Sequence, residues 1–169
     1  MKPLTFLVRH EMPEDHAWIE AIHALAFGPG RFAKTAYRLR EGIPADLAIS
    51  FVTLYGGVPC GSVRLTPITI GDDAALLLGP LAIHPDMQGR GGGGLLVNAA
   101  LEAARDAGHR LVLLVGDPPY YQRFGFEAVP FGRITLPGPV DPARLMIAGL
   151  VPGAAAAAHG MARRISTAG

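Results

Sequence analysis

Residues 81–96 read LAIHPDMQGRGGGGLL, the end of an apolar strand followed by a glycine-rich loop and the first residues of a helix. The strand is expected over Ala74–Ile83, and the helix over Leu95–Ala107, where leucine and alanine recur at helical spacing. A second apolar run, Leu111–Val115, is typical of a strand buried on both faces. Strand, loop, helix and strand form a βαβ unit, so we expect parallel strands and a right-handed crossover.

Before this unit the hydrophobic pattern changes to a period of two. Leu47–Tyr55 and Val58–Ile70 flank Gly56-Gly57, a pattern that indicates an antiparallel hairpin. A proline within the second run, Pro67, predicts an edge or a bulge there. Gly79-Pro80 interrupts the next strand and predicts a break in its ladder. The fold class is therefore mixed α/β, in which antiparallel N-terminal strands precede one parallel βαβ unit.

Two helices are expected nearer the N-terminus, after a short β-prone run at Leu4–Val8. Pro13 starts the first, which buries a stripe that contains Trp18, Ile22 and Leu25. The second is expected over Arg31–Glu41, with an apolar face formed by Phe32, Ala36 and Leu39. Its basic residues are expected to lie largely in solvent: Arg31, Lys34, Arg38 and Arg40. A short helix or turn over 118–126 and one or two more strands complete the chain, and no repeat or linker divides residues 1–169, so a single domain is expected.

Composition excludes several classes of protein. Of the 169 residues, 50% are hydrophobic and 17% charged, so the chain can bury a core and is not intrinsically disordered. Fifteen basic and fourteen acidic residues give a net charge of +1, so we expect no nucleic-acid or membrane partner. A single cysteine, Cys60, excludes a disulfide framework, and the histidines show no metal-ligand spacing, so no metal is expected. With no signal peptide or membrane span recognised, a soluble cytoplasmic protein is expected.

The glycine loop presents backbone N–H groups at a helix N-terminus, a geometry that suits a phosphate or pyrophosphate. Arg90 adds a charge that can contact a phosphate oxygen. A flexible turn without a ligand is the simpler interpretation. Residues 89–94 also satisfy the G-x-G-x-x-G pattern of dinucleotide sites, but the first glycine lies six positions beyond the strand end and only one βαβ unit is present. A Walker-type site is excluded because no Gly-Lys-Ser/Thr follows the loop.

Two motifs together resemble the GNAT superfamily of acyl-CoA N-acyltransferases. Gln88-x-x-Gly91-x-Gly93 is similar to its acyl-CoA signature, and Tyr120–Phe126 (YYQRFGF) to its Tyr-x-x-Phe-Gly-Phe segment. Within the superfamily, Leu78–Ala82 and Gly116–Tyr121 most resemble a group of small bacterial acetyltransferases. The resemblance covers about residues 4–150.

The resemblance implies a cofactor site and a reaction. The strands before and after the loop would splay apart, and backbone groups of Leu81, Ala82 and Ile83 would pair with the pantetheine arm of acetyl-CoA. The pyrophosphate would lie on the loop, whose residues are Gln88, Gly89, Arg90, Gly91, Gly92, Gly93 and Gly94. Tyr121 would act as the general acid toward the leaving thiolate, while an amine attacks the thioester directly. The segment Phe27–Phe32 would border the acceptor pocket, and a homodimer is the arrangement implied.

The general base is not identified by the motifs. The polar residues near the two strands are Asp72, Asp73, His84 and Asp117, and each has an ordinary turn or capping role as the alternative. Water could also act as the base, or the acceptor could arrive as a neutral amine. Gly92 and Gly94 depart from the usual aliphatic and polar residues and predict a loose first helical turn. The expected function is therefore an N-acetyltransferase for an unidentified small-molecule or peptide amine; the alternative is a non-catalytic acyl-CoA-binding or sensing module.

Overall fold

The computed structural model describes residues 5–30 and 34–165, and nine strands of this part form a mixed sheet. The strands are β1 (Phe6–His10), β2 (Phe51–Tyr55), β3 (Val58–Ile70), β4 (Asp73–Ile83), β5 (Leu111–Val115), β6 (Glu127–Ala128), β7 (Ile134–Thr135), β8 (Leu145–Gly149) and β9 (Gly160–Arg164). The helices are α1 (His16–Phe27), α2 (Thr35–Arg40), α3 (Gly92–Asp106), α4 (Pro118–Tyr121) and α5 (Ala154–Ala157). None of the described helices is long and apolar enough to span a membrane.

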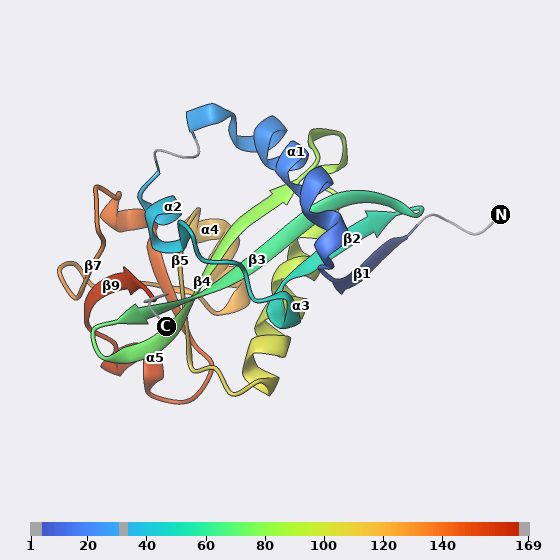
Figure 1. The fold of residues 1–169 in the computed structure, drawn as a ribbon. Helices are drawn as coiled ribbons and strands as arrows, with labels where there is room; N and C mark the ends of the chain where they lie inside the picture. The colour runs from blue at the N-terminus through green and yellow to red at the C-terminus, as the bar shows by residue number, and fades with distance from the viewer. Residues whose placement is uncertain (1–4, 31–33, 166–169) are drawn as a thin grey trace.

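The main path of the sheet runs β1-β2-β3-β4-β5-β8-β6, and β9 joins the far end of β3 and carries β7. Each neighbour on the main path is antiparallel except β4 and β5, which are parallel and joined by α3 (Figure 1). This confirms the mixed α/β class, the hairpin across Gly56-Gly57 and the βαβ unit. Pro67 lies where β3 has passed the end of β2 and not yet met β9, so its missing N–H breaks no pairing.

Alternate residues of β4 enter two separate cores. Leu76 and Leu78 face α3, whose buried side chains include Leu96 and Ala100. Leu77 faces the other way, with Leu39 of α2 and residues of α5 and β9. The helix α1 lies across the face opposite α3 (Figure 1). Because both faces are covered, β4 and β5 are apolar on both sides, as expected for buried parallel strands.

The β4 and β5 strands pair over a short stretch and then separate. Within the described residues they are in register at Leu76↔Val112 and Leu77↔Leu113. The β3–β4 register then shifts, so that Arg64 alone stands opposite Gly79 and Pro80, whose peptide bond is cis. This is the irregularity predicted at Gly79-Pro80. Beyond it β4 continues along β3, and its edge toward β5 is open.

Several local expectations are wrong, each for a tertiary reason. The helix α3 begins at Gly92 rather than Leu95, because Gly91 adopts φ 92° as its N-cap and Gly92 packs under Phe6. Residues 47–49 form a 3-10 turn instead of strand, and Leu25 is 62% exposed rather than buried. Four strands, not one or two, follow residue 126. The predictions for Leu4, Arg31 and Phe32 concern residues outside the described part of the chain.

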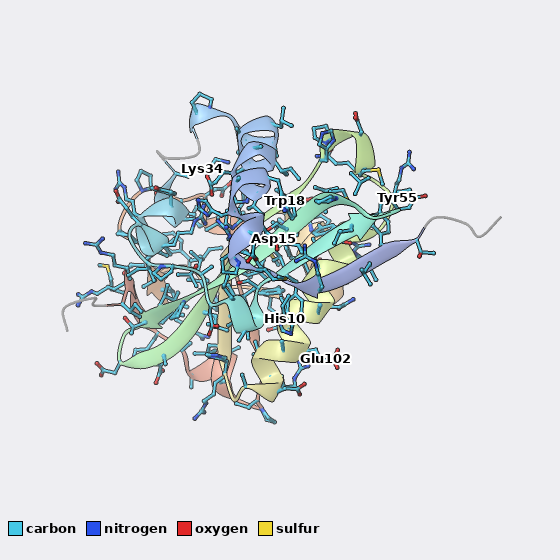
Figure 2. All side chains as sticks on the ribbon, turned by 45° about the vertical axis from the view of Figure 1, so that its right-hand side comes forward. His10, Asp15, Trp18, Lys34, Tyr55 and Glu102 are labelled. Carbon is cyan, nitrogen blue, oxygen red and sulfur yellow. The ribbon has the colours of Figure 1, made fainter. Side chains whose placement is uncertain are left out.

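The start of α1 is tied to β1 through Asp15. Its carboxylate accepts two hydrogen bonds from Arg9 (2.7 and 2.9 Å), one from Trp18 Nε1 (2.9 Å) and one from the Met12 N–H (2.8 Å). Figure 2 shows Asp15 and Trp18 adjacent at this end of the helix. The Arg9 hydrogen bonds, opposed by burial, lower the pKa of Asp15 from 3.8 to about 2. The ionised carboxylate therefore stabilises the fold above pH 4.

We expect Asp15→Asn to lower the free energy of unfolding by about 2 kcal/mol at pH 7, because the shift of the pKa corresponds to that difference. A depressed folded-state pKa means that the contribution is lost as the pH falls from about 4 toward 2. Urea unfolding of the wild type and the variant from pH 2 to 7 checks this. Asp72→Asn, at an exposed turn, is the control. A difference between wild type and Asp15→Asn that stays constant down to pH 2 would contradict the prediction.

Candidate active site

Two hollows lie on either side of the point where β4 leaves β5. The first, the wedge hollow, has a volume of about 500 Å³. It lies between residues 78–81 of β4, residues 115–117 at the end of β5, and the facing sides of α1 and α2. The second, the loop hollow, has a volume of about 950 Å³ and lies between the glycine loop and residues 119–124. Leu81 and Tyr120 line both. A molecule that follows β4 would therefore pass from one hollow to the other.

The loop hollow is built around the N-terminus of α3. A hydrogen bond from Leu95 N to Gly91 O (3.3 Å) is an opening bond of the helix. The N–H groups of Gly92, Gly93 and Gly94 precede this bond, so they have no partner within the helix and point out of its end. With the positive end of the dipole of a 15-residue helix, they make a site suited to an anion.

Aromatic side chains pack closely against the same glycines. A Cβ on Gly93 would lie 2.6 Å from Tyr120 Oη, and one on Gly94 would lie 3.6 Å from Phe124 Cζ. Gly92 to Gly94 lie in the first turn of α3, and a side chain at Gly93 would collide with Tyr120. The loose first turn expected from these glycines stays a prediction. Of the seven loop residues expected to hold the pyrophosphate, Gln88, Gly89 and Gly91–Gly94 line the loop hollow.

Two of the three predicted β4 residues face the open edge. The His84 N–H donates to Cys60 O in β3 (2.7 Å), and the direction of backbone groups alternates along a strand. The backbone of Ala82 therefore also points to β3, where it is in register with Ser62, and Ala82 is only 2% exposed. Leu81 and Ile83 point the other way and line the loop hollow; Gln88 Nε2 donates to Ile83 O (3.4 Å).

The arginine that lines the loop hollow is Arg123, not Arg90. Arg90 is exposed and lies over the ring of Tyr55, 6.0 Å from its centroid, outside both hollows. Arg123 Nε donates to Tyr120 O (3.2 Å), and its guanidinium lies 4.6 Å from the Tyr120 centroid. Arg123 was not predicted from the sequence. Its spacing of three residues from Tyr120 in a short helical segment was the available signal.

Tyr121 lines the wedge hollow beside the end of β5. Its ring lies directly over Gly116, where a Cβ would collide with it, and meets the Tyr120 ring edge-on at 5.0 Å. Burial is the main cause that raises the pKa of Tyr121 to about 12; Tyr120 adds to the shift and Arg144 opposes it. The phenol therefore keeps its proton well above neutral pH and can act as a donor.

Of the polar residues considered as bases, Asp117 alone lines the wedge hollow. Asp72 and Asp73 are exposed in the β3–β4 turn, and His84 accepts a hydrogen bond from the Asp86 N–H (3.1 Å). Cys60 is buried, and its thiol donates to Thr53 O (3.5 Å). The described residues contain no group of three or more His, Cys, Asp or Glu placed to hold a metal.

The wedge hollow contains polar groups from α1 that the sequence analysis missed. Glu20 accepts a hydrogen bond from Arg64 Nη1 (3.3 Å), and its carboxylate lies 3.8 Å from His23 Nδ1. Both side chains line the hollow. They precede β4 by at least 50 residues, so only the packing of α1 on the sheet brings them to the wedge.

In this chain the two parallel strands of a βαβ unit separate beside a helix that begins with glycines. This arrangement is typical of a class of protein that binds an extended, phosphate-bearing cofactor between the separated strands. Comparison with known proteins identifies the class. The model of the acetyltransferase (GNAT) domain matches residues 46–128. Two Escherichia coli K12 relatives, both named uncharacterized N-acetyltransferases, share 35% identity over 117 residues (YjhQ) and 32% over 123 residues (YhbS). This chain belongs to the GNAT family of acetyltransferases.

The alignments cover most of the chain. The YjhQ alignment spans 67% of this chain and 65% of YjhQ; the YhbS alignment spans 72% and 73%. The crystal structure of Escherichia coli YhbS in complex with CoA superposes with a TM-score of 0.82 at 26% identity, covering 98% of this chain and 92% of YhbS. A GNAT acetyltransferase from Brucella melitensis in complex with acetyl-CoA gives 0.61 at 30% identity, covering 84% and 94%.

Proposed function

We propose that the chain acts as a single acyltransferase domain that moves the acetyl group of acetyl-CoA to a primary amine of a small molecule or peptide. The observation that carries the proposal is the parting of β4 and β5 between two hollows that share Leu81 and Tyr120. The CoA and acetyl-CoA complexes of the YhbS and Brucella relatives support it. A non-catalytic module is not favoured, because the similar proteins are named as N-acetyltransferases.

In this proposal the cofactor follows the open edge of β4. The pyrophosphate lies on the N–H groups at the start of α3, with Gln88 and Arg123 beside it. The pantetheine arm pairs with the backbone of Leu81 and Ile83. Ala82 has no part in this pairing because its backbone faces β3, and Arg90 is left at the outer surface of the loop.

The reaction proposed for the wedge hollow is direct attack of the neutral amine on the thioester carbon. The new C–N bond forms, the C–S bond breaks, and the amine proton leaves to water or to a carboxylate of the hollow. Tyr121 gives its proton to the departing thiolate and regains one from solvent. Removing a proton from an amine with a pKa near 10.4 costs about 4–5 kcal/mol at pH 7, and Glu20 and Asp117 are the carboxylates placed to lower that cost.

Titration calorimetry with acetyl-CoA tests the cofactor assignment, and release of free CoA in the presence of amines tests transfer. A thiol reagent can report the CoA, because Cys60 is buried and contributes little background. We expect micromolar binding and amine-dependent thiol release. Absence of acetyl-CoA binding would overturn the proposal; sedimentation of the same sample tests the homodimer that the resemblance implies.

A further inference from the structure

A half-buried charge, that of Arg40, lines the wedge hollow. Arg40 is the last residue of α2, and its Nη1 lies 3.8 Å from the position of a Cβ on Gly79. The guanidinium thus reaches the segment of β4 that has separated from β5. The sequence analysis expected Arg40 to point into solvent, and this expectation is wrong because α2 packs with its last turn over the hollow.

Among the described residues, Arg40 differs from the neighbouring arginines of the hollow in having neither an acidic partner nor a hydrogen bond. Arg64 is held by Glu11 (2.9 and 3.1 Å) and Glu20 (3.3 Å), and Arg144 Nε donates to Gly116 O (3.1 Å). Among the described residues, no carboxylate lies within 4 Å of the Arg40 guanidinium and no hydrogen bond from it is formed. Its contact is with the face of the Tyr37 ring, 5.6 Å from the centroid.

This environment is costly for a positive charge. Burial, together with Arg64, lowers the pKa of Arg40 to about 10, against the opposing influence of Tyr37 and Glu20. The guanidinium is still fully charged at pH 7. A desolvated charge is strongly destabilising unless an opposite charge with good hydrogen-bond geometry accompanies it. A bound anionic group would supply that partner.

The balance of charge in the hollow favours the same conclusion. Its lining has four basic side chains and two acidic ones. The basic ones are Lys34, Arg40, Arg64 and Arg144; the acidic ones are Glu20 and Asp117. Glu20 is already engaged by Arg64. Lys34 directly precedes α2, the helix that ends at Arg40. A polycationic amine would meet an excess of like charge here, whereas an anion would be attracted.

We propose that the acceptor is a small primary amine that also carries an anionic group, a carboxylate or a phosphate, and that Arg40 binds this group. A planar guanidinium matches either group with two parallel hydrogen bonds. A volume of about 500 Å³ is that of a small-molecule pocket. Tyr121 and Gly116 line the same hollow, so an anion bound at Arg40 would hold the amine in the hollow that contains the proposed general acid. This inference rests on the proposed function and specifies its substrate class.

The test compares acceptors that differ only in the anionic group. Acetyl-CoA binding is first measured by calorimetry, and thiol release is then followed with free amino acids, their carboxamides, phosphoethanolamine, ethanolamine and polyamines. We expect kcat/KM to be at least tenfold higher for the preferred anionic amine than for its uncharged counterpart. Use of amino acids but not phosphoethanolamine, or the reverse, identifies the anion.

Variants then assign the preference to one side chain. Arg40→Gln is expected to raise the KM of the anionic acceptor about 30-fold, the loss of a charged hydrogen-bonded contact. Arg40→Gln should also bring the ratio of kcat/KM for an amino acid to kcat/KM for its carboxamide close to one. Arg40→Lys should restore part of the preference for the acid. Arg38→Gln is the matched control, since Arg38 is on the same helix, exposed, and bonded to Pro137 O. The Kd of acetyl-CoA should not change in any of these.

The outcomes separate this inference from the proposed function. Acetyl-CoA binding with equal use of acids and amides, with preference for polyamines, or with no acetylation of any anionic amine would overturn the inference and leave the cofactor assignment intact. If Arg40→Gln kept the wild-type ratio of kcat/KM between amino acids and their carboxamides, the role of Arg40 would be overturned. Absence of acetyl-CoA binding would overturn the proposed function, and this inference with it.

Discussion

Replacing Tyr121 by phenylalanine is expected to lower kcat for acetyl transfer about 100-fold, the lower range for loss of a general acid. The ring contacts with Tyr120 and Phe126 survive the substitution, so the fold and the Kd of acetyl-CoA should change little. What is lost is the proton donor at the wedge hollow, and the thiolate must then leave without one. Steady-state kinetics with a chosen amine and calorimetry with acetyl-CoA measure the two effects separately.

The pH profile sharpens the same prediction. Because burial raises the pKa of Tyr121 to about 12, the phenol is protonated throughout pH 6–10. In the wild type, kcat should therefore rise as the amine or its base loses a proton and should not fall again below pH 10. Tyr55→Phe, which removes a hydroxyl outside both hollows, is the control. If kcat of Tyr121→Phe equals that of the wild type across this range, Tyr121 is not the acid.

The second large effect is expected from Gly93→Glu, which should raise the Kd of acetyl-CoA at least 100-fold. A Cβ at Gly93 would lie 2.6 Å from Tyr120 Oη, so the new side chain must displace the tyrosine or enter the loop hollow. Its carboxylate would also stand at the N–H groups proposed to bind the pyrophosphate, where it competes with and repels the phosphates. Calorimetry measures the change directly.

A matched substitution controls for the added glutamate. At Gly30 a Cβ meets nothing within 4 Å, so Gly30→Glu adds the same charge without the collision. It should leave the Kd of acetyl-CoA within about twofold. Far-UV circular dichroism checks that Gly93→Glu retains its helices. A folded Gly93→Glu variant with wild-type affinity would remove the cofactor from this loop.

Much of the fold was predictable because its signals are local. The period of two around Gly56-Gly57 determined the β2–β3 hairpin, and the apolar runs flanking the glycine loop determined the parallel pair β4 and β5. The Gly79-Pro80 pair marked the bulge opposite Arg64. In each case neighbouring residues contain the whole pattern, since strand alternation and turn geometry are set over a few residues.

The glycine loop and Tyr121 of the candidate site were also recognisable in the sequence, because each belongs to a contiguous motif. The sequence did not predict which backbone groups face the wedge. Ala82 is as apolar as Leu81 and Ile83, and only the pairing of β4 with β3 shows that its backbone faces β3. The proximity of Tyr120, Phe124 and Phe6 to the glycines of the first turn of α3 was not predictable either, because these rings come from distant segments.

By itself, then, the sequence determined the class of fold, the order of the elements from β2 to β5, the glycine loop and the tyrosine of the motif that follows. The tertiary structure alone decided which charges meet in the wedge hollow. Arg40 is one of several basic residues along its helix, and only the docking of that helix against β4 buries it. Glu20 and Arg64 are 44 residues apart and form an ion pair only when α1 crosses the sheet. Burial and partnership are properties of long-range packing, which no local period encodes.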